Sequence, residues 1–95
     1  MAKVAFTAQA KRDLAGIADF IARDDPDRAV SFTLELRDAC EALAVFPRAY
    51  PVIRRFGANA HKRSLGDYLI IYDVVGSSVT IRFIVHGARN LDALP

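Results

Sequence analysis

Residues 62–72 decide the fold of this chain, and they read Lys-Arg-Ser-Leu-Gly-Asp-Tyr-Leu-Ile-Ile-Tyr. Gly66-Asp67 suits a two-residue hairpin turn with glycine in the first position, so the residues on either side are expected to pair as strands. A second turn at Gly76-Ser77-Ser78 leads into the apolar stretch 79–85, which predicts a third strand. The last third of the chain is therefore expected to form a three-stranded antiparallel meander.

An amphipathic helix is expected well upstream of these strands. The weak alternation of residues 3–6 predicts a short first strand, and Thr7 is a suitable N-cap for a helix of about 16 residues. Gly16 falls in mid-helix, where we expect it to allow a close approach of a second helix. The apolar residues recur every three or four positions, the spacing of one buried helix face. They are Ala10, Leu14, Ile17, Ala18 and Ile21, with Phe20 widening the stripe.

A second helix is expected to begin at Asp25-Pro26. Proline disfavours helical geometry in the residue before it and suits the first helical position, so Asp25 serves as the N-cap. The helix is expected to end near Phe46-Pro47, and the short link between the two helices predicts an antiparallel hairpin. The apolar stripe of the second helix holds Ala29, Phe32, Leu36, Cys40 and Leu43.

These patterns together predict an α+β fold in a single domain over residues 1–95, with a strand, a helical hairpin and then the three-stranded antiparallel meander. Residues 69–71 are apolar on both strand faces, so we expect this strand to be central, with the helices over one side. Leu36 and Ile71 are assigned to the core, and residues 48–59 to a loop.

Composition narrows the class of protein. With 53% hydrophobic and 25% charged residues, the chain has the composition of a globular domain rather than of a disordered one. No apolar run approaches the roughly 20 residues that span a bilayer, and the start lacks the apolar segment of a signal peptide. Cys40 stands alone and cannot form an internal disulfide. We therefore expect a cytoplasmic protein that does not bind membranes.

Charge is unevenly distributed along the chain. Residues 1–47 hold six Lys and Arg against eight Asp and Glu, whereas residues 48–95 hold seven against three. A basic C-terminal half favours an acidic or phosphate-bearing partner, although ordinary surface scatter gives the same count. The candidate target-binding residues all lie in this half. They are Arg54, Arg55, Lys62, Arg63, His86 and Arg89.

Two interpretations of this basic set stay open. If its members converge, the cations could grip RNA phosphates and His86 could act as a general acid or base. Otherwise Arg54 and Arg55 are solvated loop residues, and His86 bonds its own turn. Tyr68 and Tyr72 share one strand face and are expected to pack rather than to stack on bases.

Other chemistry has little support in the sequence. We expect no metal site, because His61, His86 and Cys40 lack the spacing of metal ligands. We expect no cofactor, because phosphate loops and dinucleotide fingerprints are absent. No catalytic residue is assigned.

The order of these features resembles a known family. The chain resembles the ParE toxins of bacterial type II toxin–antitoxin modules, within the RelE/ParE superfamily. The resemblance lies in Asp25-Pro26 between the helices, Phe46-Pro47 after them, residues 66–72 and the His-Gly-Ala-Arg-Asn-Leu of residues 86–91. The resemblance covers essentially the whole chain. It implies a plasmid-stabilisation toxin that a small ParD-like antitoxin of the ribbon-helix-helix type holds inactive in a hetero-oligomer. ParE members poison DNA gyrase, whereas RelE members cut messenger RNA on the ribosome.

Within that superfamily the residues favour the gyrase branch. RelE-type nucleases usually carry an arginine where this chain has Leu69, and commonly end with a tyrosine, where this chain finishes Leu94-Pro95. Arg89 matches a nuclease arginine, and Lys62 and Arg63 lie near the strand-two lysines of the superfamily. An incomplete cationic set would stabilise the cleavage transition state poorly. The resemblance therefore implies a gyrase inhibitor without catalysis.

Two alternatives remain. Some nucleases of the superfamily use histidines, so His61 and His86 keep a ribosome-dependent endoribonuclease open. A degenerate member that binds its antitoxin but has lost toxicity is the third possibility.

Overall fold

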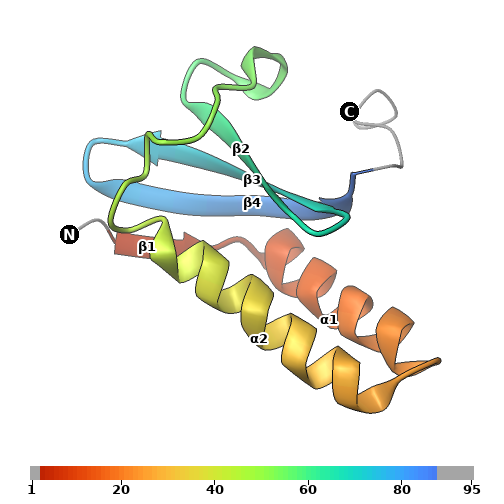
Figure 1. Ribbon diagram of the computed structural model, residues 1–95. Coiled ribbons are helices and arrows are strands. Elements are labelled where there is room, and N and C mark those ends of the chain that lie inside the picture. Colours follow the sequence, from red (N-terminus) through yellow and green to blue (C-terminus); the bar gives the residue numbers. More distant parts are fainter. Residues whose placement is uncertain (1–2, 88–95) are drawn as a thin grey trace.

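The computed structural model describes residues 3–87. A helical hairpin lies along one face of a sheet, and the segment that joins the hairpin to the second strand crosses to the other face (Figure 1). We name these two sides of the sheet the helix face and the outer face. The elements in chain order are β1 (Lys3–Phe6), α1 (Ala8–Ala22), α2 (Pro26–Ala42), the 3₁₀ turn η1 (Arg54–Phe56), β2 (Ala60–Leu65), β3 (Tyr68–Val75) and β4 (Ser78–His86).

The sheet has four strands in the order β1-β4-β3-β2. The predicted α+β fold and its antiparallel meander are confirmed, since β2 pairs with β3 and β3 with β4 in antiparallel register. Gly66 and Gly76 begin the two hairpin turns with φ angles of 57° and 59°, which glycine adopts without strain. β1 pairs in parallel with β4, so the chain crosses over through the helices before it returns to the sheet. β3 is internal to the sheet, as the apolar residues on both of its faces predict.

Both helices begin at the caps that the sequence predicts. The Thr7 hydroxyl accepts a hydrogen bond from the amide of Ala10, and the Asp25 carboxylate accepts one from the amide of Arg28. The end of the second helix was predicted wrongly. α2 ends at Ala42 rather than near Phe46, because the next turns tighten to hydrogen bonds between residues three apart. Phe46 is consequently 72% exposed.

The main core lies between the hairpin and the helix face of the sheet. It joins most of the predicted stripes of both helices to Ile70, Tyr72, Val74, Val79, Ile81 and Ile84. Ala18 and Ala29 of those stripes are not part of this cluster, and Ala18 is only half-buried. Ile71 is also fully buried, but strand alternation turns it to the outer face, so it belongs to a different layer from Leu36.

Two expectations for α1 are wrong. A Cβ atom at Gly16 would meet nothing within 4 Å, so this glycine does not mediate contact between the helices. Phe20 is 54% exposed and does not widen the core stripe. Both residues instead border an open space beside β4. Neither helix within residues 3–87 is both long and apolar enough to cross a membrane.

Candidate functional site

The basic residues predicted on β2 lie on opposite faces of the sheet. Lys62 pairs with Ile71 and Arg63 with Ile70, and neighbouring residues of a strand alternate between faces. Lys62 therefore lies on the outer face and Arg63 on the helix face. The two cations cannot grip one phosphate together from these positions.

Arg63 has structural partners. Its guanidinium donates a hydrogen bond of 2.9 Å to the backbone carbonyl of Ala39, in the last turn of α2. It also lies 5.0 Å from the centre of the Tyr50 ring. A cation that satisfies a free carbonyl at a helix C-terminus stabilises that end of the helix. Arg63 thus ties β2 to α2 and to the segment that follows it.

His61 lies beside this connection and is only 6% exposed. Its ring stacks on Tyr72 with 5.4 Å between centroids, and its Nδ1 lies 2.7 Å from the carbonyl oxygen of Tyr50. The Tyr72 hydroxyl donates a hydrogen bond to the carbonyl of Pro47. Burial, and to a smaller extent the neighbouring Tyr50, raises the pKa of Tyr72 to about 12. His61 packs within this cluster and is shielded from solvent.

Arg54 and Arg55 lie on η1, and the guanidinium of Arg55 is 5.7 Å from the centre of the Phe56 ring. Sequence analysis missed a further basic residue, Arg82 on β4, which contacts η1. Arg82 occupies the register shift between β3 and β4 and donates to the carbonyl of Phe56 at 2.6 Å and to Asp73 at 3.4 Å. Arg82 therefore fastens η1 to the outer face. Arg89 lies outside the described residues.

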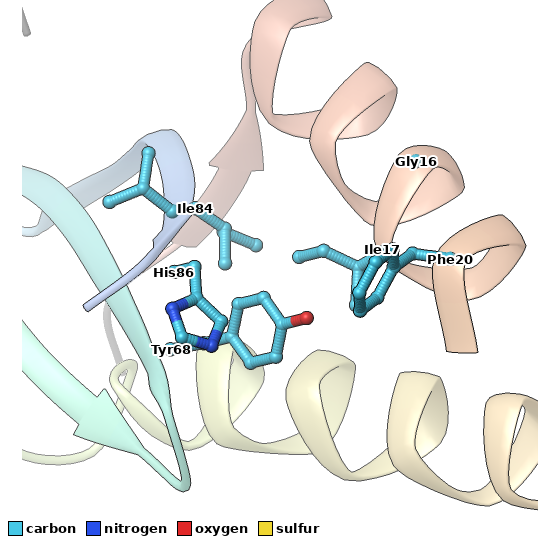
Figure 2. A pocket seen from close by; sticks show the side chains of 7 residues that line it. Gly16, Ile17, Phe20, Tyr68, Ile84 and His86 are labelled. Carbon is cyan, nitrogen blue, oxygen red and sulfur yellow. The ribbon is translucent and has the colours of Figure 1, made fainter. Parts of the chain in front are cut away.

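His86 lines a pocket between α1 and the end of the sheet (Figure 2). The pocket has a volume of about 430 Å³, in the range of small ligand sites. Its lining is mainly apolar and comes from α1, β3 and β4. It is formed by Gly16, Ile17, Phe20, Tyr68, Ile84, Val85 and His86, and we name it the α1–β4 pocket.

Two polar side chains stand at this pocket. The rings of Tyr68 and His86 pack edge to face at 5.2 Å, and the Tyr68 hydroxyl points across the pocket toward Ile17 and Phe20 (Figure 2). Tyr68 also packs on Phe32 at 5.5 Å, which confirms a packing role for this ring. Among residues 3–87, the buried Nδ1 of His86 has no hydrogen-bond partner. The pocket offers apolar contact with hydrogen-bonding groups at one wall.

A second apolar hollow, of about 480 Å³, follows the far side of the helical hairpin. Val30 and Leu34 are 64% and 56% exposed there. Small residues such as Ala18 and Ala22 keep the hollow shallow, and Asp19 and Arg37 flank it. We name it the hairpin groove. Exposed apolar side chains that gather in this way mark an interaction surface.

Cys40 is buried on α2 and forms no disulfide among the described residues. Burial, with the adjacent Glu41, raises the pKa of Cys40 to about 12, so this thiol is not a nucleophile near neutral pH. Within residues 3–87, no three His, Cys, Asp or Glu side chains gather to hold a metal ion. The α1–β4 pocket and the hairpin groove are both mainly apolar and fit the binding of another protein.

Comparison with known proteins decides the family. A family model described as ParE toxin of type II toxin-antitoxin system, parDE, matches residues 4–91. The chain belongs to the ParE toxin family. A solved structure titled "Chromosomal ParDE TA system from P. aeruginosa" resembles this ParE-family chain with a TM-score of 0.78 and 17% identity, over 90% of this chain and 96% of that one. No curated sequence matches the chain significantly.

The sequence identified only part of this ParE-family surface. It named His86 as a candidate site residue, but it did not assign any other residue of the α1–β4 pocket to a site. The sequence signal that could have indicated this pocket is the pair Gly16 and Phe20. These two residues lie about one helical turn apart, at the edge of the apolar stripe.

Proposed function

We propose that this ParE-family toxin inhibits DNA gyrase in the cytoplasm and is neutralised by a ParD-like antitoxin of the ribbon-helix-helix type. One observation carries the first part. The cations that would serve a nuclease are divided between two faces of the sheet, with Lys62 on the outer face and Arg63 engaged with Ala39 on the helix face. Phosphoryl transfer needs cations that converge on one phosphate, whereas binding a target protein does not.

Leu69 supports the same conclusion. It lies on β3 at the position where the related nucleases usually carry an arginine, and its aliphatic side chain cannot stabilise a charged phosphate. The target surface in this proposal is the basic C-terminal half of the chain, with Arg89 as its principal residue. In the same proposal Lys62, Arg54 and Arg55 contribute from the outer face of the sheet, and Arg63 and His86 contribute from the helix face, so the target would contact more than one side of the chain.

The experiment that tests the target compares two activities of one purified preparation. The protein should block supercoiling by gyrase and leave ribosome-bound messenger RNA intact. Cleavage of that RNA at defined codons, with supercoiling unaffected, would overturn the gyrase assignment.

The endoribonuclease remains the second candidate because of one observation. The buried Nδ1 of His86 has no partner among the described residues, so its imidazole is not committed to a structural hydrogen bond there. In this alternative His86 acts as a general acid or base, and messenger RNA cleavage disappears in the His86→Ala variant. An unchanged melting temperature of His86→Ala is the control, because His86 also packs on Tyr68 and its loss must not be read as a folding defect.

The antitoxin is proposed to wrap the helical hairpin and to run along the sheet. The hairpin groove has the exposed apolar side chains that such a partner would cover, and the interface should exceed about 1,200 Å². Hydrogen exchange with and without antitoxin should show protection over α1, α2 and a sheet edge. Protection limited to residues 48–59 would contradict this arrangement. A small acidic reading frame beside the gene would identify the partner.

A further inference from the structure

The segment that crosses the outer face of the sheet carries basic residues and no acidic ones. Residues 42–66 contain no Asp or Glu, and their basic residues are Arg48, Arg54, Arg55, Lys62 and Arg63. Arg54 and Arg55 belong to the outer face because they lie on η1, and Lys62 belongs to it because it pairs with Ile71. Asp73 is the only acidic residue of β2, β3 and β4, and it pairs with Arg82 at 3.4 Å. Within residues 3–87 the outer face therefore has a surplus of positive charge.

The backbone that carries Arg54 is fixed against the sheet. Arg82 donates a hydrogen bond of 2.6 Å to the carbonyl of Phe56, and the Phe56 ring packs edge to face on Phe83 at 5.2 Å. Both contacts join η1 to β4. A cation on a backbone that is already ordered loses less conformational freedom when it binds a partner.

Arg54 and Lys62 are both accessible from the outer side. Arg54 is exposed, and together with Val52 and Ala58 it lines an open hollow of about 420 Å³. Lys62 is partly exposed on β2, and the exposed Ser64 lies two residues along the same strand and so on the same face. Arginine, lysine and serine side chains are among those that contact the phosphates of DNA.

The outer face also differs from the helical hairpin in its apolar exposure. No large apolar side chain from residue 53 to residue 74 is exposed, whereas Phe20, Val30 and Leu34 are exposed on the two helices. Protein partners are held by apolar and aromatic anchors, while interfaces with DNA are more polar and much more positively charged. The outer face therefore fits a polyanion, and it lies on the opposite side of the sheet from the hairpin (Figure 1).

We propose that Arg54 and Lys62 bind the phosphate backbone of duplex DNA, with Arg55 and Ser64 beside them. The inference rests on the proposed function in taking the DNA on which gyrase acts as the polyanion that this face meets. Contacts with phosphates carry no information about base sequence, so the binding is independent of sequence. When both surfaces are engaged, the DNA contact adds to the affinity for gyrase.

The first test follows the fluorescence anisotropy of a labelled duplex of about 20 base pairs as full-length wild-type protein is added. The dissociation constant should lie between about 1 and 100 μM, the range of binding that does not depend on sequence. Contacts with about two or three phosphates predict a 10- to 40-fold fall in affinity between about 50 and 200 mM salt. Duplexes of unrelated sequence should bind equally well. An affinity that does not change with salt would overturn the proposal.

The second test compares two double variants that lose the same charges. Arg54→Gln with Lys62→Gln removes the proposed contacts, whereas Lys11→Gln with Arg12→Gln removes one lysine and one arginine from exposed positions on α1. The first pair should weaken DNA binding at least about tenfold and reduce the slope of log affinity against log salt by about two. The second pair should stay within about threefold of wild type. Equal losses in the two variants would reflect net charge alone and would overturn the proposal.

Melting temperatures of both double variants should match that of the wild type. Arg54→Gln alone, at an exposed position, should reduce the salt slope by about one, so it provides the same test if the double variant is unstable. A salt slope that Arg54→Gln leaves unchanged would remove Arg54 from the contact and overturn the proposal.

Two competitors distinguish duplex DNA from other polyanions. Unlabelled duplex should displace the labelled duplex at a lower concentration of charge than either polyglutamate or single-stranded RNA. Equal or better competition by polyglutamate would assign the outer face to an acidic protein, and by RNA to a ribonucleic acid. Either result would overturn the proposal.

A supercoiling assay on the same samples tests the proposed target separately. Wild-type protein that inhibits gyrase but does not bind duplex DNA would refute the DNA contact and leave the proposed target standing. Wild-type protein that binds duplex DNA through Arg54 and Lys62 but does not inhibit gyrase would refute the proposed target alone.

Discussion

The guanidinium of Arg63 donates a hydrogen bond to the carbonyl of Ala39, so a residue of the edge strand β2 closes the C-terminal end of α2. The same guanidinium lies over the Tyr50 ring. One side chain therefore connects the hairpin, the sheet and the segment between them. These contacts assign Arg63 a structural role, whatever it also contributes to target binding.

Replacing Arg63 should destabilise the fold. Arg63→Met keeps an apolar stem but loses the hydrogen bond to Ala39 and the contact with Tyr50, which should cost about 1–3 kcal/mol of unfolding free energy. Urea denaturation measures the loss. Lys62→Met is the matched control on the outer face and should stay within about 0.5 kcal/mol of wild type. Equal losses in the two variants would show that the Ala39 contact contributes nothing.

Two leucines on α2 provide a sharper test of the core. Leu36 is fully buried whereas Leu34 is 56% exposed, so the same truncation should destabilise the fold strongly at Leu36 and hardly at all at Leu34. Leu36→Ala should cost roughly 2–5 kcal/mol, and so should Ile71→Ala from the outer layer. Leu34→Ala should stay within about 0.5 kcal/mol. If Leu36→Ala unfolded at the same urea concentration as the wild-type protein, the assignment of Leu36 to the buried face of α2 would be wrong.

High pH should weaken the fold through Cys40 and Tyr72. Burial raises both pKa values to about 12, above their ordinary values of 9.0 and 10.0, so the folded state holds the neutral forms. A raised folded pKa gives stability that is complete below the unfolded pKa. It is lost as the pH rises through the folded pKa. Urea midpoints should therefore be level up to about pH 8 and fall between about pH 9 and 12. Cys40→Ala should fall less steeply over the same interval, and an unchanged slope would mean that the thiol ionises freely in the folded protein.

The sequence predicts the local parts of this fold well. Thr7 and Asp25 cap helices because their side chains satisfy nearby amides, and Gly66 and Gly76 make turns that need a positive φ. These features depend on a few neighbouring residues. The end of α2 was missed because it depends on the tighter turns after Ala42 and on the distant Arg63.

The candidate site was harder to predict because it depends on pairing between distant segments. The alternation of β2 already implies that Lys62 and Arg63 face opposite ways, but which face the helices cover is settled only by packing. The parallel pairing of β1 with β4 has no local signal in residues 3–6. Gly16 was assigned to helix contact because a glycine in mid-helix does not reveal which neighbour it faces.

Arg89 provides the last prediction, on the proposed target surface. Positive charge is concentrated after residue 47, so in the proposed function Arg89 is expected to contact an acidic surface of gyrase. Arg89→Ala should weaken toxicity in growing cells and raise the concentration needed to block supercoiling. Antitoxin affinity should stay near wild type if the two surfaces are distinct. Arg12→Ala, which removes an exposed arginine from α1, is the control and should inhibit gyrase as wild type does. Undiminished gyrase inhibition by Arg89→Ala would remove Arg89 from the target surface. An equal loss of inhibition in Arg89→Ala and Arg12→Ala would instead indicate a general effect of net charge.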